Sequence, residues 1–177
     1  MTEKGKVTRV LFVCLGNICR SPAAEGIMRQ MAEEHGMGHR FFIDSAGIGS
    51  WHVGQLPDRR MRRHGERHGY RFESRARQFS MADFARFDLI VGMDEENVAD
   101  LMAMARTEDD AKKIRCMKDY LVNHPHLRSV PDPYYGGDRD FELVIELLED
   151  GCAELIRKEG APEGGVRTHP SPPKGRE

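Results

Sequence analysis

A cysteine followed by an arginine in one short loop carries the strongest chemical signal in the sequence. Cys14 and Arg20 lie within the segment Cys-Leu-Gly-Asn-Ile-Cys-Arg-Ser-Pro, 14–22. The apolar run 10–13 before it is typical of a buried parallel strand. After it, Ser21 suits a helix N-cap and Pro22 a first helical position. A strand, a tight turn and a helix N-terminus are therefore predicted to meet at one point, which favours a bound anion.

The residue types in this loop fit nucleophilic attack on a phosphate. Only the thiolate of a cysteine attacks, and the loop N–H groups, the helix dipole and Arg20 all favour that form of Cys14. The planar fork of Arg20 can clasp two phosphoryl oxygens. Gly16 permits positive φ and close approach of a ligand, Asn17 tolerates the left-handed region, and Ser21 can donate to the sulfur. A cysteine that merely ends a buried strand is the alternative, and these neighbours make it the weaker interpretation.

A second segment, Val-Pro-Asp-Pro-Tyr-Tyr-Gly-Gly over 130–137, offers an acid. Phosphoryl transfer to a thiolate leaves an alkoxide or phenoxide that needs a proton. The prolines on either side of Asp132 restrict the backbone and favour an extended conformation there. We predict that Asp132 is the general acid and that it later activates water as a base. The alternative is an Asx-type turn before a helix.

Three segments together resemble one family, the low-molecular-weight protein tyrosine phosphatases. They are the 14–21 loop, Asp-Ser-Ala-Gly at 44–47 and Asp-Pro-Tyr-Tyr at 132–135, in the family's order, and the resemblance extends over about residues 7 to 158. It implies a phosphocysteine at Cys14, a transition-state clamp at Arg20 and the acid/base at Asp132, with no metal or cofactor. The remaining implied residues bind phosphate (Leu15, Gly16, Asn17, Ile18, Cys19, Ser21), support the loop (Ser45) or form the substrate pocket (Trp51, Tyr134, Tyr135).

Two positions bear on how this chain compares with that family. Many members carry a histidine that supports the loop asparagine, where this sequence has Ser74. Relatives that act on phosphoarginine have threonine where this sequence has Ile18, so the resemblance implies phosphotyrosine. Aromatic walls would form a slot too deep for phosphoserine. The predicted partner is therefore a phosphotyrosine-containing protein, and the oligomeric state is left open.

Other members of the same fold provide the competing functions. Thioredoxin-coupled arsenate reductases need two further cysteines near the third strand, and residues 78–97 contain none. A phosphocarrier must keep its phosphocysteine until a partner protein accepts the phosphoryl group. A residue such as Asp132, which can activate water, would instead hydrolyse it. A phosphate-binding module without turnover is the remaining alternative, but the loop contains every group that catalysis would need from it.

The other cysteines are assigned smaller roles. The resemblance implies that Cys19 forms a reversible disulfide with Cys14 and protects it from overoxidation, whereas a small core residue is the alternative. Cys152 falls on the apolar face of a predicted helix and Cys116 in a short predicted strand, so both read as core. With no signal peptide predicted, we expect reduced cysteines and a cytoplasmic protein.

The order of elements predicts an α/β fold. Strands are expected near 7–13, 41–45, 88–93 and 114–117, and helices near 22–35, 58–69, 94–105 and 138–158, with a short one after Ser80. Such alternation predicts a flavodoxin-like, open four-stranded parallel sheet with helices on both faces. Ligands bind at the carboxyl ends of such strands, where Cys14 and Ser45 both fall.

Length and composition limit the remaining possibilities. The 177 residues fit one domain, predicted over 1–158, with a flexible proline-rich tail over 159–177. The net charge of −2 and the lack of a long apolar run argue against nucleic acid and membrane insertion. Histidines 52, 64 and 68 lack metal-ligand spacing, so no metal is predicted. The arginines of the second helix form a solvated face or, alternatively, guide acidic phosphopeptides (Arg59, Arg60, Arg62, Arg63, Arg67, Arg71).

Overall fold

The computed structural model describes residues 6–160, which form a parallel four-stranded sheet. Its strands are β1 (Thr8–Cys14), β2 (Phe41–Gly47), β3 (Leu89–Gly92) and β4 (Ile114–Cys116), in the order β2-β1-β3-β4. All neighbouring strands are parallel. The predicted flavodoxin-like α/β fold is thus confirmed.

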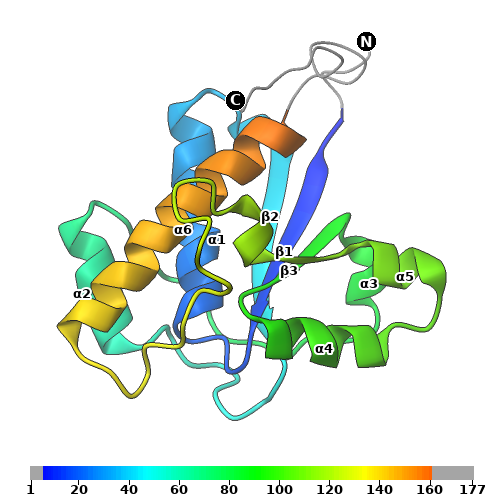
Figure 1. Ribbon diagram of the computed structural model, residues 1–177, viewed down its shortest axis with the longest axis horizontal. Coiled ribbons are helices and arrows are strands. Elements are labelled where there is room, and N and C mark those ends of the chain that lie inside the picture. Colours follow the sequence, from blue (N-terminus) through cyan, green and yellow to red (C-terminus); the bar gives the residue numbers. More distant parts are fainter. Residues whose placement is uncertain (1–5, 161–177) are drawn as a thin grey trace.

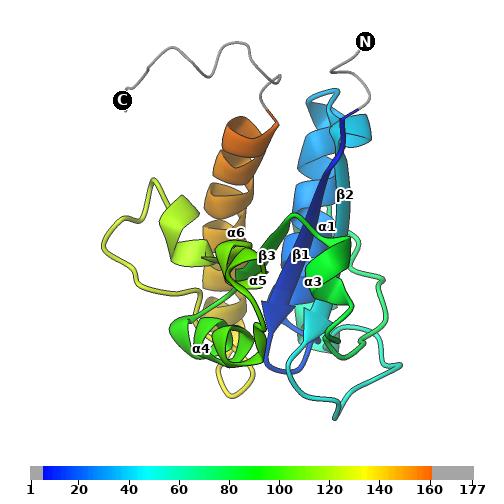
Figure 2. The ribbon, with the colours of Figure 1, turned by 90° about the vertical axis from the view of Figure 1, so that its right-hand side faces the viewer.

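Helices cover both faces of this sheet (Figures 1 and 2). On one face lie α1 (Arg20–Glu34) and α6 (Asp138–Glu159), with α2 (Arg59–Arg67) packed against α6. The other face carries α3 (Asp83–Arg86), α4 (Glu95–Met104) and α5 (Glu108–Lys112). Two 3₁₀ turns, η2 (Gly38–Arg40) and η3 (Met117–Tyr120), complete the regular elements of the described part.

The apolar residues of β1 divide the core between the two faces. Val10 and Phe12 belong to the cluster beneath α1 and α6, whereas Leu11 and Val13 belong to the cluster beneath α3 and α4. All four are fully buried. Successive side chains of a strand point to opposite faces, so a continuous apolar run is what a strand covered on both sides requires.

One helix boundary and one whole helix differ from the sequence prediction. The predicted N-cap at Ser21 is wrong, because α1 already begins at Arg20 and its N-cap, Cys19, forms no side-chain cap bond. Helix α5 was not predicted at all. It is short and acidic, buries no residue, and starts where the hydroxyl of Thr107 accepts from the Asp110 N–H. No apolar periodicity marks such a helix in the sequence.

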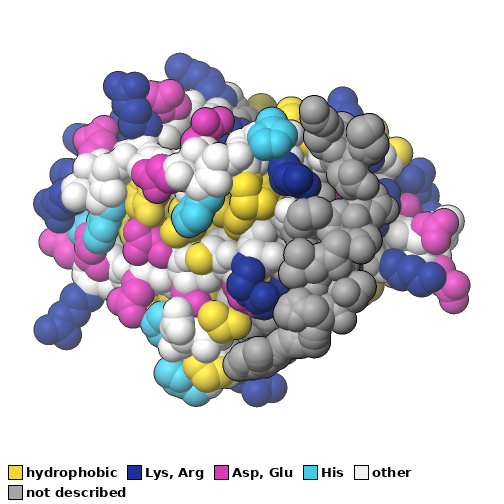
Figure 3. All heavy atoms as spheres, turned by 90° about the horizontal axis from the view of Figure 1, so that it is seen from above, with side chains coloured by type: hydrophobic (Ala, Val, Ile, Leu, Met, Phe, Trp, Pro, Cys, Tyr) yellow, Lys and Arg dark blue, Asp and Glu magenta, His cyan; other side chains and the backbone are white. Residues whose placement is uncertain are grey.

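The strand register brings the carboxyl ends of the three longest strands together. Cys14 of β1 lies opposite Gly47 of β2, and Val13 lies opposite Gly92 of β3. The segments that follow these strands therefore meet at one edge. At the opposite edge, where the strands begin, basic and acidic side chains are interspersed over the described surface, with apolar ones between them (Figure 3).

The end of α6 marks the limit of what the structure describes. The helix ends at Glu159 with Gly160 as its C-cap, and residues 161–177 of the predicted tail lie outside the described residues. Within 6–160, no helix has the length and apolar character needed to cross a bilayer.

Candidate active site

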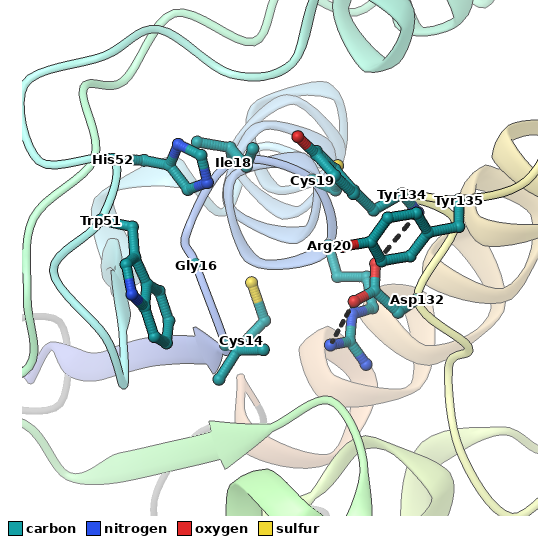
Figure 4. Close-up of a pocket in the computed structure, with 11 residues that line it drawn as sticks. Cys14, Gly16, Ile18, Cys19, Arg20, Trp51, His52, Asp132, Tyr134 and Tyr135 are labelled. Atoms are coloured by element: carbon teal, nitrogen blue, oxygen red, sulfur yellow. Dashed lines mark hydrogen bonds and ion pairs between the residues drawn. The ribbon is translucent and has the colours of Figure 1, made fainter.

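Cys14 is the last residue of β1 and lies at the base of a cavity (Figure 4). It is 3% exposed. Its Sγ lies 3.0 Å from the hydroxyl of Ser21, and the backbone N–H of Ser21 points at the same sulfur from 3.4 Å. Because Ser21 stands in the first turn of α1, where backbone N–H groups lack helical partners, the sulfur faces the positive end of the helix dipole.

Beneath the loop, the side-chain amide of Asn17 joins three segments of the chain. Its Nδ2 donates to Ser21 Oγ at 2.7 Å and to Ser45 Oγ at 3.0 Å. Its carbonyl oxygen accepts from the backbone N–H of Arg77 at 3.0 Å. Asn17 adopts φ of 59°, so the predicted left-handed conformation is confirmed. The amide is thereby fully committed to holding the loop.

This arrangement fixes the direction of the serine protons. Each serine hydroxyl accepts from Asn17, so its own proton must be donated elsewhere. Ser45 donates to Oε1 of Glu25 at 2.6 Å. Ser21 has the Cys14 sulfur at 3.0 Å and the Ala46 carbonyl at 3.4 Å, and the shorter contact favours the sulfur. A hydrogen bond of this kind stabilises a thiolate.

Glu25 is a supporting residue that the sequence interpretation missed. It is 3% exposed, and its second oxygen accepts from Arg29 at 2.8 Å. Within the described residues, Ser74 forms no hydrogen bond with Asn17; the backbone N–H of Arg77 donates to the Asn17 carbonyl oxygen instead. A glutamate one helical turn after Ser21 was the available signal, but its contact with Ser45 comes from tertiary packing.

Arg20 is held from two sides. Its Nη1 donates to Asp94 Oδ2 at 2.7 Å and to the Val130 carbonyl at 3.0 Å. The side chain is 3% exposed. Burial disfavours the charged form, but Cys14 and the hydrogen-bonded Asp94 outweigh this and raise the pKa of Arg20. Asp94, the second residue that sequence reasoning missed, also N-caps α4 by accepting from Asn97.

Asp132 lies opposite this arginine, on the loop that leads to α6. Its Oδ1 accepts from the Tyr134 N–H at 3.1 Å, and its Oδ2 lies 3.8 Å from Nη2 of Arg20. The side chain is 44% exposed. The carboxylate is therefore fixed at one oxygen and open at the other, on the same side of the cavity as Arg20 (Figure 4).

The cavity has a volume of about 290 Å³ and brings most of the predicted residues together. Ser21, Asn17 and Ser45 lie beneath it rather than in its wall. His52 lines the cavity but was not predicted as a pocket residue. The lining comprises Cys14, Leu15, Gly16, Ile18, Cys19, Arg20, Trp51, His52, Asp132, Tyr134 and Tyr135.

Gly16 is needed for space rather than for a positive φ. It is not among the described residues with positive φ, so that part of the prediction is wrong. A Cβ at this position would lie 3.1 Å from the His52 ring. The glycine therefore allows His52 to close over the loop, which is a close approach within the protein itself.

The remaining histidines and cysteines lie elsewhere. His64 and His68 both contact Glu142 of α6, and His64 also contacts Asp138. Across residues 6–160 no group of three or more His, Cys, Asp or Glu side chains is placed to hold a metal ion. Cys116 and Cys152 are buried.

A buried thiol facing an arginine at the carboxyl edge of a parallel sheet is suited to receive a phosphoryl group. Comparison with known proteins agrees. The family described as low molecular weight phosphotyrosine protein phosphatase matches residues 9–161. The chain therefore belongs to the low molecular weight phosphotyrosine protein phosphatase family.

Relatives from distant organisms support this assignment. A putative low molecular weight protein-tyrosine-phosphatase of Synechocystis is 49% identical over 152 residues, covering 86% of this chain and 96% of the relative. The human low molecular weight phosphotyrosine protein phosphatase is 37% identical over 151 residues, covering 84% and 94%.

Solved structures agree as well. A protein tyrosine phosphatase from Entamoeba histolytica with Hepes in its active site has a TM-score of 0.83 and 42% identity, covering 86% of this chain and 97% of that one. A Drosophila arginine phosphatase has a TM-score of 0.79 and 31% identity, covering 86% and 98%.

Proposed function

We propose that this protein hydrolyses phosphotyrosine in proteins through a phosphocysteine at Cys14. The observation that carries the proposal is the position of Cys14 Sγ, at the base of the cavity with the Ser21 hydroxyl at 3.0 Å. Arg20 and Asp132 line the same cavity. A nucleophile, a clamp and an acid therefore face one volume in which a phosphate can be held.

In the first step, the Cys14 thiolate attacks phosphorus and the bond from phosphorus to the tyrosine oxygen breaks. The loop N–H groups and the guanidinium of Arg20 stabilise the equatorial oxygens. Protonated Asp132 donates its proton to the leaving phenolate. Free tyrosine departs, and the phosphoryl group remains on the sulfur.

In the second step, Asp132 acts as the base. Its carboxylate removes a proton from a water molecule, which attacks the phosphorus of the phosphocysteine. The bond from sulfur to phosphorus breaks, and the electron pair stays on Cys14. The Ser21 hydroxyl, directed at the sulfur by Asn17, stabilises this thiolate leaving group.

The walls of the cavity favour phosphotyrosine as the substrate. Trp51, Tyr134 and Tyr135 provide aromatic faces around the mouth, and Tyr135 is 94% exposed, open to a protein substrate. Phosphoarginine is the second candidate, because one structural relative is described as an arginine phosphatase. The apolar side chain of Ile18 in the loop favours the phenyl ring.

The test is an assay with p-nitrophenyl phosphate and with phosphotyrosyl, phosphoarginyl and phosphoseryl peptides, in reductant and without added metal. We expect turnover that Cys14→Ser abolishes, and kcat/KM highest for phosphotyrosine. Full activity of Cys14→Ser, or turnover only with added metal, would overturn the mechanism. A preference for phosphoarginine would overturn the substrate assignment alone.

Redox control through Cys19 belongs to the same proposal. Burial, with a smaller contribution from the Asp58 carboxylate, raises the pKa of the Cys19 thiol, so it stays protonated while Cys14 reacts. Peroxide would oxidise Cys14 to a sulfenic acid. The Cys19 thiol then loses its proton as its sulfur attacks that of Cys14, and the proton leaves with the displaced hydroxide as water, which gives the disulfide. Because this disulfide would block Cys14, activity requires reducing conditions, and the cytoplasm provides them.

The redox step is tested by peroxide treatment followed by reductant. The wild type should recover its activity, and Cys19→Ser should recover much less. Mass spectrometry should show a Cys14–Cys19 disulfide in the treated wild type. Equal recovery of the two proteins would argue against Cys19 as the resolving thiol.

A further inference from the structure

A charged pair outside the cavity touches both loops of the site. Asp58 is the N-cap of α2, and its backbone N–H donates to the carbonyl of Ile18, in the nucleophile loop 14–21, at 2.7 Å. Its carboxylate accepts from Nε and Nη2 of Arg60 at 3.1 and 3.0 Å. The pair is therefore anchored to the loop that holds Cys14.

On its other side, Arg60 holds the acid loop 130–137. Its Nη2 donates to the Tyr134 carbonyl at 3.0 Å. Its guanidinium carbon lies 5.5 Å from the centre of the Tyr134 ring and 4.7 Å from that of Phe141, a buried residue of α6. Cation–π contacts of this kind and the hydrogen bond fix both the backbone and the ring of Tyr134.

Tyr134 in turn holds the acid. Its backbone N–H donates to Asp132 Oδ1 at 3.1 Å, which turns the other oxygen toward Arg20. Figure 4 shows Tyr134 and Asp132 side by side at the wall opposite Trp51. Arg60 itself does not line the cavity, so it can influence the reaction only through the residues it holds.

The pair keeps its charges across the working range of pH. Burial alone would raise the pKa of Asp58, but its hydrogen bonds from Arg60 outweigh this and lower it. The hydrogen bond with Asp58 raises the pKa of Arg60. The residues that contact the two loops are therefore themselves joined by a bidentate ion pair at the start of α2.

We propose that Arg60 is a positioning residue that holds the general acid Asp132, through Tyr134, in register with the nucleophile loop. This inference rests on the proposed function, because it concerns the acid step of that reaction. It follows that Arg60 matters most when the leaving group needs a proton. A more acidic phenol leaves as its anion with little help from a proton donor. The tyrosine hydroxyl, whose pKa is about 10, needs a proton to leave.

The test is the ratio of kcat/KM for 4-nitrophenyl phosphate to kcat/KM for phenyl phosphate. In Arg60→Met we expect this ratio to rise about tenfold, since general acid catalysis contributes about 10²–10⁴-fold and part of it is retained. Arg60→Lys should give an intermediate ratio, because lysine keeps the charge but not the fork. Arg63→Met, which removes an exposed arginine from the same helix, should leave the ratio unchanged.

A double-mutant cycle tests the route through Asp132. In the Asp132→Asn background, Arg60→Met should change the ratio by less than about twofold, because the acid is already absent. An unchanged ratio in both Arg60 variants would overturn the proposal, as would an equal tenfold rise in the Asp132→Asn background. Thermal unfolding of each variant shows that the protein tested is folded.

If the proposed function is wrong, the wild type itself shows no Cys14-dependent turnover of either aryl phosphate. If only the Arg60 inference is wrong, the wild type turns over both substrates and its ratio survives the Arg60 substitutions.

Discussion

The nucleophile loop and the acid loop of the site differ most in their exposure to solvent. The first is buried: Cys14 is 3% exposed, Ser21 is fully buried, and Asn17, which forms the hydrogen bonds beneath the loop, is 2% exposed. The second lies at the surface, with the Asp132 side chain 44% exposed. The groups that we propose bind phosphate are fixed before a substrate arrives, whereas the proposed acid lies on a rim open to a protein substrate.

The energetic consequence is that the two loops depend on different interactions. Beneath the nucleophile loop, an unpaired amide or hydroxyl has no water to bond, so each lost hydrogen bond costs stability. In the acid loop, water can replace a lost partner, so the same loss changes geometry more than stability. Substitutions should therefore separate the two loops by their effects on unfolding.

The largest effect is expected for Asn17→Ala, which removes the donor to Ser21 and Ser45 and the acceptor for the Arg77 N–H. Buried unpaired groups cost about 1–3 kcal/mol each, and alanine at positive φ costs about 1–2 kcal/mol. The free energy of unfolding should fall by about 4 kcal/mol or more, and kcat by about 10²–10³-fold. Urea unfolding and steady-state kinetics measure the two, with Gln30→Ala, at a partly exposed position of α1, as the control.

Asp132→Asn should instead affect activity alone. Losing the proton donor should lower kcat/KM for phosphotyrosine by about 10²-fold. Because the carboxylate is half exposed, the free energy of unfolding should change by no more than about 0.5 kcal/mol. A large loss of stability would contradict the contrast between the two loops.

Glu25→Gln gives a smaller effect on the buried side. Ser45 and Arg29 donate to different oxygens of Glu25, and glutamine keeps only one neutral oxygen because its NH2 group cannot accept. The partly exposed Arg29 can turn to water, and the charge-assisted bond from Ser45 exceeds a neutral one by about 1 kcal/mol. We expect a loss of about 1 kcal/mol and about tenfold in kcat. Glu34→Gln, an exposed residue of the same helix, is the matched control, and an equal effect there would remove the role assigned to Glu25.

The smallest effect concerns the segment that leads into the acid loop. His124 lies 2.8 Å from both Asp150 and Glu146 of α6, and these hydrogen bonds, first that of Asp150, raise its pKa. A raised folded-state pKa stabilises the protein fully below pH of about 6.5, the unfolded value, and the contribution disappears as pH rises through the folded-state pKa.

His124→Gln should therefore lower the melting temperature most near pH 6 and progressively less toward pH 9. The expected loss near pH 6 is about 0.5 kcal/mol, as for surface ion pairs. Melting curves across this range, with the exposed His126→Gln as control, measure the difference. A deficit that grows with pH would contradict the assignment.

Most of the fold could be predicted from the sequence because its signals are local. The apolar run of β1, the alternation of strands and helices, and the short segments that carry Cys14 and Asp132 are all contiguous in the chain. The two wrong predictions also have local causes. Helix α5 buries no residue, so no apolar periodicity marks it in the sequence. The hydroxyl of Ser21 contacts the Cys14 sulfur and does not cap the helix.

The partners that complete the site could not be predicted in this way. Glu25, Asp94 and Arg60 act on residues far from them in the chain, and only the packing of α1, α2 and α4 around the sheet brings them there. His52 was known only as a histidine without metal spacing, because its place over Gly16 depends on the course of a loop. Sequence motifs thus pointed to the groups that we propose react, but missed most of the residues that hold them in place.

Both oxygens of the Asp94 carboxylate are used, so we expect position 94 to tolerate no other residue well. One oxygen caps α4 through Asn97 and the other holds Arg20. Asparagine would offer a single neutral acceptor, and glutamate is one methylene too long for the cap. A library that randomises this position and selects for turnover should return aspartate almost alone, although the residue does not line the cavity.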